Sequence, residues 1–162
     1  MIRYKGEIDD FLQKSKSQHK GKVNIIHSGF DPIHIQVSGD RATSEAFCSV
    51  TSSVTLNGVD YELCSHMRLF IRLLRLSDDG EWRMLSLEST YVRDRLITAY
   101  PQSGPSLEIP EKLSDYPKPY RMLAMVMLSR GMSPRTDLPH EDDPESVKAI
   151  AEHNQAFLNG TL

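Results

Sequence analysis

Two side chains in this sequence have the chemistry and the setting expected of a proton-transfer site, His27 and Glu88. His27 ends the apolar run 23–27 and precedes Ser28 and Gly29. This pattern predicts an imidazole at the rim of a sheet, at the mouth of its concave side, where a neutral histidine is a natural proton acceptor. A lone histidine beside an apolar run is more often a hydrogen-bonded structural residue, and both interpretations stay open at this point.

Glu88 is a catalytic candidate in one register of the expected sheet. If a four-residue loop joins Leu76 to Glu81, alternation of side chains places Glu88 on the apolar side. Carboxyl groups held among apolar side chains exchange protons near neutral pH, because burial disfavours the charged form. A bulge or a different loop length would instead place Glu88 in water beside Arg68 or Arg72.

The elements that must position these groups are three long runs of strand-forming residues, 42–56, 59–76 and 81–93. Only Asn57-Gly58 and the loop 77–80 separate them, which predicts an antiparallel meander. Fully extended, the middle run would reach roughly 59 Å, whereas a compact chain of this length is roughly 40 Å across. The sheet must therefore curl, and a deeply curled sheet holds helices and a ligand pocket on its concave side.

The Asn57-Gly58 turn also fixes which side chains share a face. It pairs Leu56 with Val59, so that one face of the first two strands is apolar and the other polar. The same register puts Cys48 and Cys64 on opposite faces, where they cannot form a disulfide, and reduced thiols favour a cytoplasmic protein. Five residues are the expected ligand contacts, the first two as hydrogen-bond donors: Tyr61, Tyr91, Met67, Leu69 and Met84.

Helices are expected before and after the meander. Residues 7–16 have the spacing of a short amphipathic helix, and 120–130 and 144–158 form two more, the last beginning at Pro144. We therefore expect an α+β domain over 1–99, a Pro-rich connector over 100–119 and a two-helix C-terminal extension over 120–162 that docks on the same domain. Met122, Met125 and Met127 either line an adaptable apolar pocket or belong to the core.

Composition excludes several classes of function. The chain has 162 residues, 39% of them hydrophobic, a formal charge of -3 and no concentrated basic stripe, so we expect no nucleic-acid partner. No apolar run is long enough for a membrane span and the N-terminus does not read as a signal peptide. The acidic run 140–143 precedes a helix and is expected to cap it, so that no metal site is predicted, and no cofactor motif is present.

The order of these motifs resembles the SnoaL-like branch of the nuclear transport factor 2-like superfamily. The resemblance covers roughly residues 4–96 and rests on the His27 loop, a Gly-Asp-x-Ala strand start at 39–42, Asn57-Gly58 and a Gly-x-Trp strand start at 80–82. The tail is similar to that of related proteins at 91–96, 120–121 and 137–139. The resemblance implies a cone-shaped fold, in which a strongly curved antiparallel sheet packs on helices.

The same resemblance implies a function. Many members are cofactor-free dehydratases, isomerases or cyclases that use a histidine and an aspartate, and His27 matches the histidine. The aspartate lies on an N-terminal helix that has no counterpart in this sequence. We therefore expect a lyase or isomerase without cofactor that acts on an apolar oxygenated molecule such as a polyketide, terpenoid or steroid-like compound. The alternative is a non-catalytic homodimerisation or small-ligand-binding module.

Overall fold

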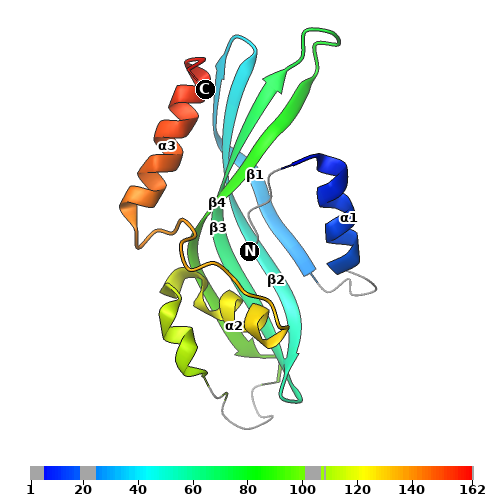
Figure 1. Cartoon of the computed structure of the whole chain (residues 1–162), viewed down its shortest axis with the longest axis vertical. Coiled ribbons are helices and arrows are strands. Elements are labelled where there is room, and N and C mark those ends of the chain that lie inside the picture. Colours follow the sequence, from blue (N-terminus) through cyan, green and yellow to red (C-terminus); the bar gives the residue numbers. More distant parts are fainter. Residues whose placement is uncertain (1–5, 19–24, 101–106, 108, 162) are drawn as a thin grey trace.

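The computed structural model describes residues 6–18, 25–100, 107 and 109–161, and it shows an α+β chain (Figure 1). Four long strands follow a first helix, and two short 3-10 helices and two α-helices follow the strands. In chain order the elements are α1 (Ile8–Gln18), β1 (Ile25–Ser38), β2 (Arg41–Leu56), β3 (Val59–Arg75), β4 (Trp82–Thr98), η1 (Glu111–Asp115), η2 (Lys118–Tyr120), α2 (Arg121–Ser129) and α3 (Pro144–Leu158).

The strands form one antiparallel sheet in the order β1-β2-β3-β4, and Figure 1 shows that it is strongly twisted and curved and does not close into a barrel. The expected meander is therefore confirmed. Asn57 and Gly58 both have positive φ, 50° and 78°, as a two-residue hairpin turn requires. Leu56 pairs with Val59 as predicted, and Cys48 and Cys64 are both free.

The residues of the His27 loop are part of β1, which continues to Ser38. The register with β2 shifts twice between Gly29 and His34, so the strand bends and continues. Gly29 has a φ of +95°, and a Cβ atom there would lie 2.3 Å from the carbonyl oxygen of Phe47. Only glycine allows the two strands to approach so closely at this point.

β4 contains two bulges. Leu73 pairs with Met84 but Arg72 pairs with Ser86, which leaves Leu85 as an extra residue. Farther along, Met67 pairs with Tyr91 but the preceding His66 pairs with Arg93, which leaves Val92 as an extra residue. Each bulge moves every later side chain of β4 to the opposite face of the sheet.

We call the two surfaces of the sheet the inner face, which carries Leu63, Met67 and Leu69, and the outer face, which carries His66 and Arg72. Helices η1, η2 and α2 pack on the inner face, at the end of the sheet nearer the β2–β3 turn. Leu113 and Ala124 are fully buried there. Residues 110–120, which we expected within the connector, thus form structure and contribute to the core.

The chain then crosses the free edge of β4 to reach the other side of the sheet. His140 forms a parallel bridge with Tyr91, whose N–H donates to Pro139 O at 2.9 Å and whose carbonyl accepts the N–H of Glu141 at 2.9 Å. Helix α3 follows and contacts β2 and β3, with the Arg41 guanidinium 5.2 Å from the ring centre of Phe157. No helix among the described residues is long and apolar enough to span a membrane.

Candidate functional site

His27 lies on β1, opposite Val50 of β2, with its side chain exposed. Its ring stacks on Phe30, with ring centres 6.0 Å apart and planes 19° apart. Phe30 reaches this position with a φ of 73°, an unusual value for a non-glycine residue. The stacking orients the imidazole at the edge strand of the sheet, on the same face as the buried core.

Glu88 lies on the outer face, where it forms an ion pair with Arg72. The Nε atom of the same arginine donates to Ser86 Oγ at 2.6 Å, so both polar neighbours of Arg72 come from β4. Leu76 and Glu81 are joined as the sequence suggested, with the Leu76 N–H donating to Glu81 O at 3.0 Å. The bulge at Leu85 nevertheless reverses the alternation, so the interpretation that placed Glu88 beside an arginine describes the structure.

The structure therefore does not bring His27 and Glu88 together. His27 shares the inner face with Val50, whereas Glu88 shares the outer face with Phe70 and Arg72. A β-sheet separates the two side chains, and a proton could not pass directly from one to the other. The pair of groups expected to act on one substrate consequently occupies two different surfaces.

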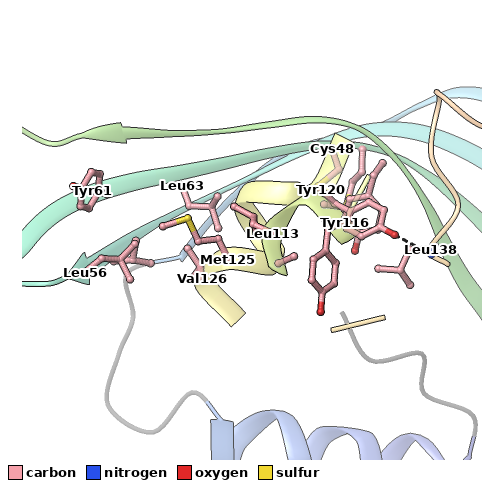
Figure 2. Close-up of a cluster of buried hydrophobic side chains, with 14 of the residues drawn as sticks. Cys48, Leu56, Tyr61, Leu63, Leu113, Tyr116, Tyr120, Met125, Val126 and Leu138 are labelled. Atoms are coloured by element: carbon pink, nitrogen blue, oxygen red, sulfur yellow. Dashed lines mark hydrogen bonds between the residues drawn. The ribbon is translucent and has the colours of Figure 1, made fainter. Parts of the chain in front are cut away.

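Four of the five expected ligand contacts lie in one buried cluster, and helix α2 fills the space in front of them (Figure 2). Figure 2 shows Met125 and Val126 of α2 beside Leu63 of the sheet, with Tyr61 farther along the sheet. Tyr91 packs against Tyr120 with ring centres 5.2 Å apart, and burial raises the pKa of the Tyr91 hydroxyl. The cluster contains Tyr61, Met67, Leu69 and Tyr91, whereas Met84 is exposed near the other end of β4.

Asp94 is a partly buried acid of the inner face that sequence reasoning missed. Its Oδ2 atom accepts the N–H of Leu123 at 2.6 Å, near the start of α2. Burial raises the pKa of Asp94 to about 6, against hydrogen bonds from Leu123 and Met122 that lower it. Alternation from Tyr91 would put Asp94 on the outer face, and the bulge at Val92 moves it inward. The two bulges cancel at this position, so simple alternation from Met84, continued past the expected end of the strand at residue 93, would also have placed Asp94 on the inner face.

An open groove on the outer face brings together apolar and charged side chains. Its volume is about 530 Å³. At its centre Arg68 Nε donates to Glu45 at 2.9 Å and Nη1 donates to Glu141 at 3.2 Å. Two carboxylates thus neutralise the arginine, which leaves little attraction for an anionic ligand. The groove is lined by Ile33, Glu45, Phe47, Arg68, Val92 and Glu141.

In the described part of the chain, no group of three or more His, Cys, Asp and Glu side chains could hold a metal ion. The acidic run before α3 places Asp143 at the N-cap position, but its side chain makes no capping hydrogen bond. Ser146 Oγ donates to Asp143 O at 2.7 Å instead.

No protein-family model matches this sequence, and no curated protein is significantly similar to it. The α+β fold with a curved, open antiparallel sheet is therefore the class that the structure itself defines.

Proposed function

We propose that this protein is a non-catalytic module that binds a second copy of itself through the inner face of the sheet, at the end that α2 does not cover. The supporting observation is a surface of exposed and half-exposed apolar side chains from β1, β3 and β4, which we call the apolar patch. Its members are Ile35, Val37, Ile71, Leu73, Trp82, Met84 and Leu87.

Strand pairing makes the apolar patch continuous. Val37 and Met84 lie at the two ends of one cross-strand row, with Ala42 and Leu73 between them. The next row runs from Ile35 to Leu87, through Ser44 and Ile71, and neither row contains a charged residue. The four side chains at the ends of these two rows are well exposed, at 59% for Ile35, 62% for Val37, 59% for Met84 and 48% for Leu87. Contiguous apolar surfaces of this kind mark interaction sites.

A second copy fits this surface because two sheets pack face to face along their apolar sides. A two-fold axis lets the same patch serve both partners. Complete burial of an aliphatic side chain contributes about 1.5 to 3 kcal/mol, so covering the four half-exposed side chains contributes about 5 kcal/mol from each copy. With an association cost at the low end of the usual range, about 4 kcal/mol, about 6 kcal/mol remains, which is a dissociation constant of tens of micromolar.

The catalytic hypothesis stays a prediction, and the geometry supports it less well. His27 and Glu88 lie on opposite faces, and Met125 and Val126 fill the space expected for a substrate. In our proposal the fold is of the nuclear transport factor 2-like type, with η1, η2 and α2 inside the curve of the sheet in place of a ligand. Two free cysteines fit the reducing cytoplasm as the site of action.

Sedimentation equilibrium from about 1 to 200 µM tests the proposal, because this range brackets the expected dissociation constant. We expect a reversible monomer–dimer equilibrium for the unaltered protein and a monomer for the double variant Val37→Glu, Leu87→Glu. Ile97→Glu is the matched control, because Ile97 is also on β4 and is 46% exposed but lies on the outer face. A protein that is monomeric throughout this range, or dimers that the control disrupts equally, would contradict the proposal.

A further inference from the structure

Three side chains with complementary proton chemistry meet on the outer face, at the end away from α3. His66 of β3 lies between a hydroxyl and a thiol. Its Nδ1 atom is 2.8 Å from Ser49 Oγ, and its Nε2 atom is 3.4 Å from Cys64 Sγ. Thr51 Oγ1 also donates to the sulfur, at 3.6 Å. Cross-strand pairing explains this cluster, because Ser49 lies opposite His66 and Thr51 lies opposite Cys64.

The arrangement gives each nitrogen of His66 a separate role. When Nδ1–H donates to Ser49 Oγ, the lone pair of Nε2 is directed at the thiol and can accept its proton. Burial lowers the pKa of His66, and the charges of Arg93 and Arg95 lower it further, which favours a neutral imidazole with a free lone pair. These two arginines lie opposite His66 and Cys64 on β4.

We propose that Cys64 is a nucleophilic thiol that small peroxides oxidise to a sulfenic acid, with His66 as the base. Nε2 of His66 takes the thiol proton, and a sulfur lone pair attacks one peroxide oxygen. The S–O bond forms as the O–O bond breaks, and the proton passes to the leaving oxygen. With hydrogen peroxide the balance is one thiol and one H2O2 to one sulfenic acid and one water, the sulfur losing two electrons and the peroxide gaining them.

The position of Cys64 favours this substrate class over larger ones. Cys64 is only 5% exposed, so a bulky electrophile cannot approach its sulfur. Acyl transfer also needs backbone N–H groups that point at a developing oxyanion, and the backbone around Cys64 is paired with strands on both sides. Attack on a peroxide has no such requirement.

Cys48 is an internal control in the same chain. It is 4% exposed, on the inner face within the hydrophobic core, and burial raises the pKa of its thiol. Because the two cysteines lie on opposite faces, Cys48 cannot reach a sulfenic acid on Cys64 in the folded protein. The oxidised state would therefore persist until a small external thiol reduces it.

The test measures the loss of each thiol separately. The folded protein is exposed to hydrogen peroxide at neutral pH, catalase stops the reaction, and remaining thiols are alkylated with N-ethylmaleimide in denaturant. A glutamate-specific protease cleaves after Glu45 and Glu62, which puts Cys48 and Cys64 in different peptides for mass spectrometry. We expect Cys64 to be oxidised at least about tenfold faster than Cys48. Equal rates, or faster oxidation of Cys48, would overturn the proposal.

The base is tested by His66→Gln, with His34→Gln as the matched control on the outer face of β1. We expect Cys64 oxidation to slow about tenfold or more in His66→Gln and to be unchanged in His34→Gln. Circular dichroism and the oxidation rate of Cys48 report whether each variant keeps its fold. A correctly folded His66→Gln protein with an unchanged rate of Cys64 oxidation would refute the role of His66. The reactivity of Cys64 itself is tested by comparing the two cysteines in the unaltered protein, which needs no variant.

Discussion

Replacement of Asp94 by asparagine should make the protein less sensitive to rising pH. The carboxylate of Asp94 sits on the inner face and accepts the N–H of Leu123 at 2.6 Å. Asparagine keeps a side-chain oxygen for this hydrogen bond but cannot ionise. The variant therefore removes the cost of a partly buried charge while it retains the contact between β4 and α2.

The raised pKa of Asp94 decides whether stability rises or falls with pH. Burial raises the pKa of Asp94 from 3.8 to about 6, so between these values the folded chain holds a proton that the unfolded chain releases. Stability due to this group therefore falls as pH rises through this window, and the full loss is present above about pH 6.

This difference in the pKa of Asp94 between the folded and the unfolded chain corresponds to about 3 kcal/mol of stability, and most of it is lost between about pH 4 and about pH 7.5. Solvent screening of a partly exposed carboxyl reduces this value, and we expect about 1 to 2 kcal/mol.

Urea denaturation followed by circular dichroism gives the free energy of unfolding at the two pH values for the unaltered protein and for Asp94→Asn. The quantity of interest is the difference between the two proteins, because it cancels the titration of all other carboxyl groups. This difference should shift by about 1 to 2 kcal/mol in favour of the variant as pH rises. Asp115→Asn, an exposed substitution, should show no shift. A difference that does not change with pH, or that changes in the opposite direction, would refute the reasoning.

Two further substitutions test the backbone and the core. Gly29→Ala should destabilise the protein by about 3 kcal/mol or more, because the new Cβ would lie 2.3 Å from Phe47 O, whereas Gly39→Ala, also at positive φ but with nothing within 4 Å, should cost only about 1 kcal/mol. Urea denaturation compares the two, and equal losses would show that β1 moves away from β2 freely. Leu113→Ala should cost about 2 to 5 kcal/mol in the same assay, because Leu113 is fully buried between α2 and the sheet, and a loss under about 1 kcal/mol would mean that η1 does not pack as described.

Local sequence determined the elements of this fold and one of its registers. The hairpin between β2 and β3 follows from Asn57-Gly58 alone, since two residues with positive φ permit only one tight pairing of the flanking strands. The C-terminal helices also begin and end close to the predicted bounds, 120–130 and 144–158, and the second begins at Pro144 as expected. These features depend on the conformations of a few neighbouring residues, and no distant contact is needed to specify them.

Tertiary structure decided where the candidate functional groups lie. The bulges at Leu85 and Val92 have no signature in the sequence, and each inserts one extra residue that bends β4. The first bulge takes Glu88 to Arg72 on the outer face, and the second brings Asp94 to the inner face beside Leu123. Because side chains alternate with a period of two, one extra residue reverses every later assignment in the strand. The sequence therefore determined the strands, and the packing of the whole chain determined which face of the sheet each group occupies.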